Sequence, residues 1–348
     1  MDSPRGRGAV DNPPNRFEPV IVEPDPDCPP EERPAPETRF YKDSTRDILS
    51  RNDSPDVPFD WGLNPYRGCE HGCSYCYARP FHEYLGFSAG LDFETRIMVK
   101  TDAAALLRKR FLDPKWEPAM VSMSGVTDAY QPVERRLRIA RACLEVFAEF
   151  LNPVAIVTKN ALVARDADLL SELSRHRAAA VFVSLTTLDA ELARRMEPRA
   201  SRPGLRLEAI ETLAKAGVNV GVMTAPVVPG LTDHELPALL KAAAGAGARF
   251  ASYVLLRLPL GVEGIFSSWL ERHYPARKKK VLSQLGEMRG GRLNDPRFGK
   301  RMRGEGPIAQ EISALFKLAR RKAGMSERGP ELSTAAFRRP AGPQLELF

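Results

Sequence analysis

The sequence predicts an α/β protein in which parallel β-strands alternate with helices, as a twisted sheet or a partial barrel. From Phe59 onward, short apolar runs alternate with amphipathic helical patterns six times. Cysteines and polar residues follow most of these runs, and parallel α/β folds place their chemistry where the strands end. The two observations together predict one functional site at one edge of the sheet.

Residues 1–58 are predicted to form an acidic, largely disordered arm. They hold 12 of the chain's 30 prolines and little periodic apolar pattern, a composition that buries too little apolar surface for a core. Residues 1–60 carry 8 Lys and Arg against 14 Asp and Glu. Cys28 lies in this arm, where no second metal ligand is expected beside it, so it is interpreted as a bystander thiol.

Residues 59–275 are predicted to form the core. Strands are expected at residues 61–66, 119–124, 154–158, 180–186, 218–228 and 250–258, and helices at 133–151, 205–216 and 233–244. The segments RGCEHGCSYC, SGVTD, TKN and APVVPG follow four of the strands, and SLTT lies in a fifth. Because parallel strands end at the same edge, these five segments are expected to meet.

Residues 276–325 are predicted to form a basic extension, and residues 326–348 a flexible tail with an apolar tip. Residues 271–328 carry 16 Lys and Arg against 6 Asp and Glu. A stripe of these cations could neutralise nucleic-acid phosphates, or form only a solvated charged surface, and charge alone leaves both interpretations open. The stripe consists of Arg277, Lys278, Lys279, Lys280, Arg289, Arg292, Arg297, Lys300, Arg301 and Arg303.

The composition excludes a membrane-spanning protein, because no window approaches the roughly 18 uninterrupted apolar residues that a span requires. The N-terminal residues MDSPRGRGAV lack the apolar core of a secretory signal. We therefore expect a cytoplasmic protein. In a reducing compartment, cysteines serve as metal ligands or catalytic groups in preference to disulfides, and the odd count of 5 agrees.

Three cysteines, Cys69, Cys73 and Cys76, form the pattern Cys-x3-Cys-x2-Cys. Thiolates this close can hold three irons of a 4Fe-4S cluster, which leaves the fourth iron open, as in catalytic metal sites. The alternative is a zinc site completed by His71 or His82. Zinc loops usually bring a second Cys or His pair from a distance, which this sequence lacks, so we interpret both histidines as surface residues or residues near the metal.

The cysteine pattern, with Tyr75 before its last cysteine and its place after the first strand, resembles the signature of radical S-adenosylmethionine enzymes. The resemblance implies a partial (β/α)6 TIM-type barrel and two cofactors, a 4Fe-4S cluster and S-adenosylmethionine. In that family the open iron is chelated by the amino and carboxylate groups of S-adenosylmethionine. Reductive cleavage then gives methionine and a 5'-deoxyadenosyl radical, which abstracts hydrogen from the substrate. An electron donor such as a flavodoxin or a ferredoxin is implied.

The segments SGVTDAYQPVE, VTKN, SLTTLD, RRMEPR and APVVPGLTD resemble a branch related to spore photoproduct lyase, a DNA repair enzyme. This resemblance covers roughly residues 60 to 270 and implies a set of residues around S-adenosylmethionine. They are Thr127 and Asp128 near its methionine moiety, Lys159 and Ser184 near its carboxylate and ribose, Glu197 and Arg199 close by, and Ala225 near the adenine. Carboxylates, hydroxyls and a basic group suit such a zwitterionic, cationic ligand.

The sequence departs from that branch in one respect. The lyase uses a cysteine near the end of the second strand as hydrogen donor, whereas this sequence has VSMSGVTD there. Cys143 is the remaining cysteine of the core, and its place among apolar residues favours a packing role. Tyr75 and Tyr77 match tyrosines proposed to relay the radical in the lyase, although Tyr77 could instead pack on the cluster.

The last five residues, QLELF, follow a Pro-Ala-Gly-Pro run. They resemble the pentapeptide with which bacterial repair and replication proteins bind the sliding clamp. Leu345, Leu347 and Phe348 would fill apolar pockets, and the Gln344 amide would bond the rim of the groove. The alternative is a tail that packs on its own domain.

Three hypotheses follow. The first is a radical S-adenosylmethionine enzyme acting on nucleic acid, with DNA as partner and repair or modification as its task. The second keeps the chemistry but has a protein, RNA or small-molecule substrate. The third is a non-catalytic metal-binding adaptor that the sliding clamp recruits.

Overall fold

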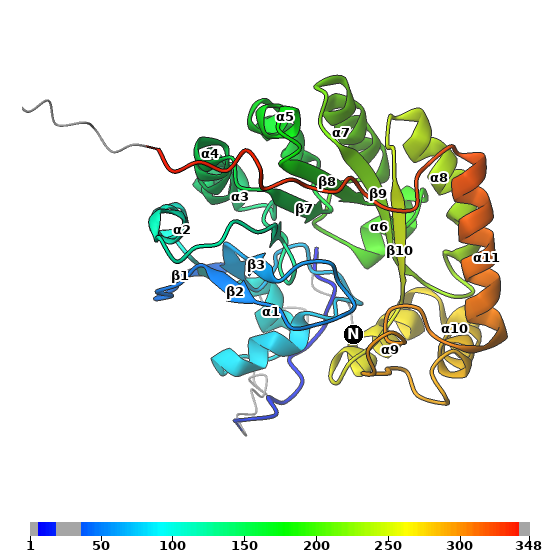
Figure 1. The fold of residues 1–348 in the computed structure, drawn as a ribbon. Helices are drawn as coiled ribbons and strands as arrows, with labels where there is room; N and C mark the ends of the chain where they lie inside the picture. Colours follow the sequence, from blue (N-terminus) through cyan, green and yellow to red (C-terminus); the bar gives the residue numbers. More distant parts are fainter. Residues whose placement is uncertain (1–5, 19–35, 341–348) are drawn as a thin grey trace, which may run out of the picture.

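In the computed structural model, which describes residues 6–18 and 36–340, the chain is built around an open, seven-stranded sheet (Figure 1). The strand order is β10-β9-β8-β7-β6-β3-β2, and every neighbouring pair is parallel except β2 and β3. The strands are β2 (Leu49–Arg51), β3 (Trp61–Leu63), β6 (Val121–Met123), β7 (Val154–Thr158), β8 (Ala179–Ser184), β9 (Val220–Val227) and β10 (Ala251–Leu255). The predicted succession of parallel strands is therefore confirmed, and the sheet is not closed into a full barrel because β10 and β2 are its free edges.

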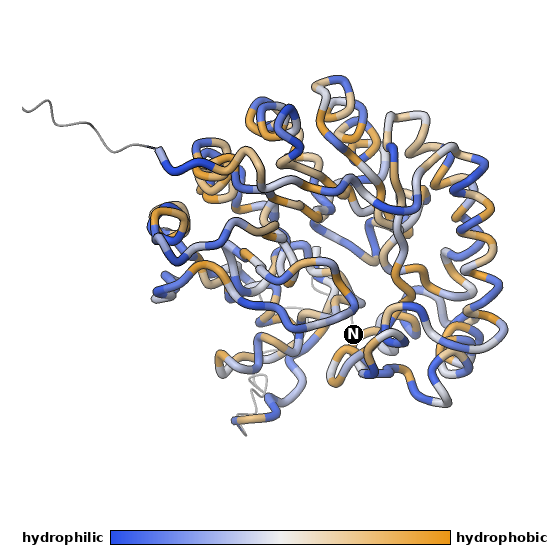
Figure 2. The backbone as a smooth tube through the Cα atoms, in the orientation of Figure 1, coloured by the Kyte–Doolittle hydropathy of each residue, from blue (hydrophilic) through white to orange (hydrophobic). Residues whose placement is uncertain are grey.

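Helices cover the outer side of this sheet. Among them are α4 (Ile139–Phe150), α5 (Ala167–Arg175), α7 (Pro203–Lys215) and α8 (Leu236–Gly245). In α4, Cys143, Leu144 and Phe147 are fully buried, as the spacing of a core-facing helical stripe requires. The helical coils in Figure 2 carry both hydrophobic and hydrophilic positions, which is the pattern of helices with one buried face.

The single helix expected at residues 133–151 is broken in two. It consists of α3 (Glu134–Leu137) and α4, separated by Arg138 in the left-handed region at φ 54°. The cause is the buried carboxylate of Glu134, which accepts hydrogen bonds from the Tyr66 hydroxyl at 2.6 Å and the Ala140 amide at 3.1 Å. Tertiary contacts thus cap the start of α4 at a position where the helical pattern itself continues.

Part of the predicted arm belongs to the fold. Within residues 36–58, β1 (Arg39–Lys42) pairs with β5 (Arg96–Val99), which also pairs with β4 (Tyr66–Arg67), and β2 extends the main sheet. The backbone amides of Gly8 and Ala9 donate to the Glu94 carboxylate at 3.0 and 2.9 Å. These described residues depart from the expected disorder because their backbone pairs with the core and three of their apolar side chains, Ala9, Ile48 and Leu49, are buried. Cys28 lies outside the described residues.

The basic extension forms α9 (Val262–His273), α10 (Pro275–Glu287) and α11 (Gly306–Lys322), and α11 packs on α8. The segment between α10 and α11 is a loop. Several cations of the predicted stripe are engaged within the protein. Arg289 is buried, and Arg297, Lys300 and Arg301 form ion pairs with Asp295, Glu305 and Asp56. These four residues therefore do not form a free cationic surface.

Residues 326–340, here called the C-terminal strap, cross the edge of the sheet where the parallel strands begin (red in Figure 1). Amides of Ser326, Ser333 and Arg338 each donate at 2.9 Å to a carbonyl that precedes a strand: Arg249 before β10, Arg177 before β8 and Phe150 before β7. The tail expected to be flexible from residue 326 is thus docked as far as residue 340. The predicted clamp-binding residues 344–348 lie outside the described residues.

The remaining elements are η1 (Arg79–Leu85), α1 (Leu91–Thr95), α2 (Ala103–Leu112), η2 (Ala161–Asp166), α6 (Ala190–Met196) and η3 (Asp233–Glu235). In the part of the chain that the structure describes, no helix has the length and apolar character needed to cross a membrane.

Candidate active site

The three cysteines lie in one loop after β4, at the edge where the strands of the main sheet end. Cys69 and Cys73 are 7% and 6% exposed, and Cys76 is half-buried. The loop turns sharply at Gly72, whose φ of 64° suits glycine, and a β-carbon there would lie 2.5 Å from the Glu94 carboxylate. The local sequence thus packs three thiols into a small volume.

Burial raises the pKa of all three thiols, and for Cys69 the neighbouring Asp128, Cys73 and Cys76 raise it further. A metal ligand must be the thiolate, so metal binding here would release protons. Grouped thiols of this kind suit a positively charged iron centre, which removes the repulsion between them.

The donor set of the loop fits an iron-sulfur cluster. Among residues 6–18 and 36–340, no three Cys, His, Asp or Glu side chains are placed to hold one metal ion, whereas a cluster gives each cysteine its own iron. The buried hydroxyl of Ser74, inside the loop, has no hydrogen-bond partner in the described residues. The cysteines are the residues that would hold the cluster.

A buried polar network joins the cysteine loop to the ends of β7, β8 and β9. The Tyr75 hydroxyl donates to the Glu197 carboxylate, which also accepts from Thr186 at 2.6 Å. Lys159 Nζ donates to Ser184 Oγ at 2.6 Å and to the Ala225 carbonyl at 2.9 Å. It also lies 3.4 Å from Glu197 Oε1. The structure thus brings Tyr75, Lys159, Ser184, Glu197 and Ala225 together.

Arg206 is a member of this network that the sequence analysis missed. Its guanidinium is 1% exposed, pairs with Glu197 and donates to the Ser184 carbonyl at 2.9 Å. Burial opposes ionisation of Glu197, yet Arg206 and Lys159 hold the pKa of that carboxyl far below its usual range. The sequence does carry one indication of this role: Arg206 lies four residues before the buried Ile210, and so on the core-facing side of α7.

Thr127 and Asp128 lie in the loop that follows β6, and their side chains bond to neighbouring loops and strand ends. Asp128 accepts from Thr158 Oγ1 and the Lys159 amide, both at 2.8 Å, and lies 3.4 Å from His71 Nδ1. The Thr127 hydroxyl donates to the Tyr66 carbonyl at 2.7 Å. Both side chains therefore border the cysteine loop while their polar groups are already bonded within the protein.

Arg199 points away from the Glu197 network. Its guanidinium pairs with Glu70 at 2.9 Å, and its amide donates to the His71 carbonyl at 3.3 Å. Arg199 thus fastens the segment after α6 to the cysteine loop.

The two tyrosines beside Cys76 have different surroundings. Tyr75 is 6% exposed in the network, whereas Tyr77 is 38% exposed and its hydroxyl donates to the Gly125 carbonyl. The guanidinium of Arg257 lies 4.4 Å from the centre of the Tyr77 ring. Of the two, Tyr77 is the one that solvent or a substrate can reach.

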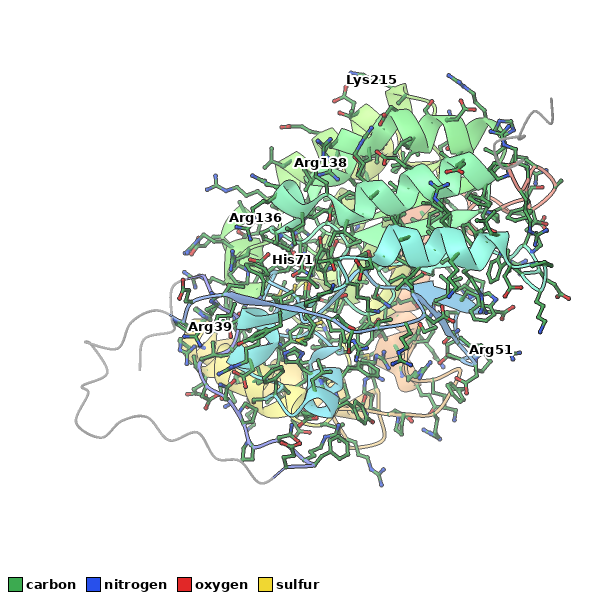
Figure 3. All side chains as sticks on the ribbon, turned by 90° about the vertical axis from the view of Figure 1, so that its left-hand side faces the viewer. Arg39, Arg51, His71, Arg136, Arg138 and Lys215 are labelled. Carbon is green, nitrogen blue, oxygen red and sulfur yellow. The ribbon has the colours of Figure 1, made fainter. Side chains whose placement is uncertain are left out.

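His71 is not a surface residue, contrary to one of the expected placements. It is 1% exposed, and its two ring nitrogens face Asp128 and Asn160 at 3.4 Å each. Figure 3 shows His71 inside the molecule, whereas Arg39, Arg136 and Arg138 lie along one side. Cys143 is fully buried in α4 and lies in the main core cluster, so its surroundings are those of a packing residue.

His82 is also buried, at 1% exposure, and its ring lies 5.2 Å from that of Phe87 and 5.7 Å from that of Phe93. Its Nε2 has no hydrogen-bond partner among the described residues. Burial lowers its pKa from 6.5 to about 4. A neutral, apolar-packed ring is the result.

We expect His82 to make the fold sensitive to acid. Its folded pKa lies below the unfolded one, so the unfolded chain binds the extra proton as the pH falls from 6.5 towards 4. The free energy of unfolding should then decrease by up to ~1.4 kcal/mol per pH unit in that window. Urea unfolding of the metal-free protein at pH 7 and pH 5 measures it, with His82→Phe as the comparison. The wild type should lose more unfolding free energy between pH 7 and pH 5 than His82→Phe does. An equal loss in the two proteins would show that groups other than His82, which both proteins share, cause the acid sensitivity.

The sequence matches the family model of the radical SAM superfamily over residues 63–243, more than half of the chain. The protein therefore belongs to the radical SAM superfamily. An uncharacterized protein of Mycobacterium tuberculosis is 40% identical over 221 residues, which cover 63% of this chain and 65% of that protein. The chain thus spans just under two thirds of that relative's length. An uncharacterized protein of Methanocaldococcus jannaschii is 27% identical over 214 residues, 61% of this chain and 76% of its own.

Spore photoproduct lyase has a similar fold. Its solved structure in complex with dinucleoside spore photoproduct superimposes with a TM-score of 0.57 and 16% identity, covering 82% of this chain and 80% of the lyase chain. At that identity the likeness concerns the fold.

Proposed function

We propose that this protein reductively cleaves S-adenosylmethionine at a 4Fe-4S cluster held by Cys69, Cys73 and Cys76. The observation that carries the proposal is the buried loop of three thiols, which Tyr75 ties to the Glu197 and Lys159 network. When bound, the cluster supplies the electron that splits the sulfonium into methionine and a 5'-deoxyadenosyl radical. An electron donor such as a flavodoxin or a ferredoxin would reduce it.

The residues around the loop have distinct tasks in this proposal. Lys159 would attract the carboxylate of S-adenosylmethionine, and Ser184 would form a hydrogen bond with its ribose. The two side chains lie 2.6 Å apart, so they would act on neighbouring parts of the same ligand. Glu197, kept anionic by Arg206, would offset the ligand's positive charge. Ala225 would border the adenine.

Thr127, Asp128 and Arg199 would act mainly through other residues. Thr127 and Asp128 would border the methionine moiety, and Asp128 would orient Lys159 by accepting from its amide. Arg199 would hold the cysteine loop through Glu70. Tyr75 and Tyr77 would serve as the radical relay, with Tyr77 on the substrate side because it is the exposed member of the pair.

We further propose that the substrate is nucleic acid, most simply damaged or modified DNA, with a lyase-like reaction. The chain carries a net charge of +7. Four arginines, Arg39, Arg135, Arg136 and Arg138, are exposed and have no carboxylate within 4.0 Å among the described residues. Arg136 lies over the exposed Phe40 ring at 5.4 Å. Exposed cations interleaved with an aromatic ring suit a polyanion with stacking bases. Docking of residues 344–348 on the sliding clamp remains part of this proposal.

The test of the proposed chemistry is anaerobic reconstitution with iron and sulfide, followed by addition of dithionite and S-adenosylmethionine. The protein should turn brown and release 5'-deoxyadenosine, measured by liquid chromatography, and candidate DNA lesions should be consumed together with the cofactor. A colourless, zinc-loaded protein that releases no 5'-deoxyadenosine would sink the proposal and favour the metal-binding adaptor.

A further inference from the structure

Arg257 is a half-buried cation at the candidate active site, and the described part of the chain gives it no anionic partner. It follows β10 by two residues, and its guanidinium covers the ring of Tyr77, the residue after Cys76. Within residues 6–18 and 36–340, Arg257 donates no hydrogen bond and has no carboxylate within 4.0 Å. Burial lowers its pKa. A cation withdrawn from water without a partner is costly, and a bound anion would offset that cost.

The backbone on both sides of Arg257 is fixed. The Leu256 amide donates to the Val227 carbonyl at 3.0 Å, and the Leu258 amide to the Leu293 carbonyl at 3.2 Å. The buried guanidinium of Arg289 donates to the carbonyls of Leu255 and Leu256. The backbone that carries Arg257 is therefore rigid, as a preorganised binding residue requires.

Positive charges around Arg257 add to the electrostatic cost of leaving its guanidinium without an anion. Arg289 and Arg301 both lie close enough for their positive charges to act on it. Asp56 is the carboxylate whose charge acts on Arg257, and it pairs with Arg301. Asp295, whose charge acts on Arg289, pairs with Arg297. The guanidiniums of Arg289 and Arg301 thus lie within electrostatic range of the Arg257 guanidinium, and no described carboxylate pairs with Arg257.

We propose that Arg257 is the binding residue for a phosphodiester group of the substrate strand, which it holds beside Tyr77. A guanidinium offers parallel N–H donors that match two phosphate oxygens. Arg301 covers the ring of Phe298 at 4.6 Å, and that ring is 56% exposed. The charge of Arg301 acts on Arg257, so this exposed ring next to Arg301 would give a base of the same strand a stacking surface, which favours a nucleic-acid strand over an acidic peptide. This inference deepens the proposed function and depends on its choice of substrate.

The experiment compares Arg257→Gln and Arg257→Lys with the reconstituted wild-type protein. Binding of a fluorescein-labelled, single-stranded oligodeoxynucleotide is followed by anisotropy at several salt concentrations. We expect Arg257→Gln to weaken binding about 10- to 100-fold, because a charge-assisted contact is lost. The slope of log affinity against log salt should fall by ~0.7, the value for one phosphate contact on a single strand. Arg257→Lys should restore the slope and only part of the affinity, since lysine keeps the charge without the fork.

Arg303→Gln is the matched control. Arg303 also stacks on a tyrosine, lying 4.1 Å from the ring centre of Tyr253, but it faces a cavity between β10 and α11. It should bind the oligonucleotide as the wild type does, and circular dichroism checks that each variant is folded. Equal binding by Arg257→Gln and the wild type, or equal losses in Arg257→Gln and Arg303→Gln, would overturn the assignment. Competition by a poly-glutamate peptide as strong as that by unlabelled oligonucleotide would overturn the choice of phosphate.

The two proposals fail in different ways. A wild-type protein that cleaves S-adenosylmethionine, combined with an Arg257→Gln variant that binds as tightly, refutes the Arg257 inference alone. A wild-type protein that cannot cleave S-adenosylmethionine refutes the proposed chemistry, whatever the oligonucleotide binding shows.

Discussion

Replacement of Cys73 by alanine is expected to reduce 5'-deoxyadenosine release to the background of the metal-free protein. Cys73 is the middle thiol of the loop, and its backbone carbonyl accepts from the Cys76 amide at 3.2 Å and from Arg79 Nε at 3.0 Å. Without this thiol, two cysteines remain for a cluster that takes cysteine ligands on its irons. Iron content, the absorbance of the cluster and product release should therefore fall together.

Cys143→Ala supplies the control for this experiment. Cys143 is more deeply buried than the loop cysteines, but it lies on the core-facing side of α4. Its replacement leaves a small cavity and should cost only about 1 kcal/mol of stability. The variant should keep its iron and its activity. If Cys143→Ala lost activity to the same degree, or if Cys73→Ala kept it, the assignment of the cluster ligands would be wrong.

Replacement of Arg79 by methionine is expected to cost ~3–5 kcal/mol of unfolding free energy, because it breaks a fully buried ion pair. Arg79 and its partner Glu94 are both 0% exposed. The guanidinium also donates to the carbonyls of Cys73, Ala89 and Gly90. Methionine of similar length leaves these carbonyls and the Glu94 carboxylate without a cation, and the cysteine loop without its support.

The effect of Arg79→Met is measured by urea unfolding of the metal-free protein. Arg175→Met is the matched control, since Arg175 pairs with Glu172 at 2.6 Å but the two side chains are 72% and 45% exposed. Exposed pairs contribute about 0–1 kcal/mol, so this variant should unfold near the wild-type midpoint. Similar midpoints for Arg79→Met and Arg175→Met would show that the buried pair does not stabilise the loop.

The sequence predicted the sheet well because strands buried on both faces consist of continuous apolar runs. The expected strand at residues 154–158 has the bounds of β7, and the others differ by a few residues at their ends. β1 and β2 were missed, because their few residues gain stability from pairing with β5 and β3, which a local pattern does not reveal. The strap was missed for the same reason, since most of its described contacts join residues far apart in the sequence.

The candidate site was predictable where a residue type carries its own chemistry. Three closely spaced cysteines indicated a metal, and the resemblance to the family pointed to Lys159, Ser184 and Ala225 within segments expected at the strand ends. Arg79, Arg206 and Arg257 were not found, because their importance depends on which partner tertiary packing provides. Glu94 and Glu197 pair with the first two, whereas Arg257 has no carboxylate partner among the described residues.

The C-terminal strap has a consequence for the order in which the protein folds. Arg339 donates to the carbonyls of Phe111 and Trp116, contacts that span 228 and 223 residues of sequence. During synthesis, β6, β7 and β8 leave the ribosome long before the residues that cover their starting ends. Contacts of such long range form late and slow folding. The nascent protein should therefore pass through a state in which the sheet exists but the edge where its parallel strands begin is still open to chaperones, and the later arrival of the strap should close it.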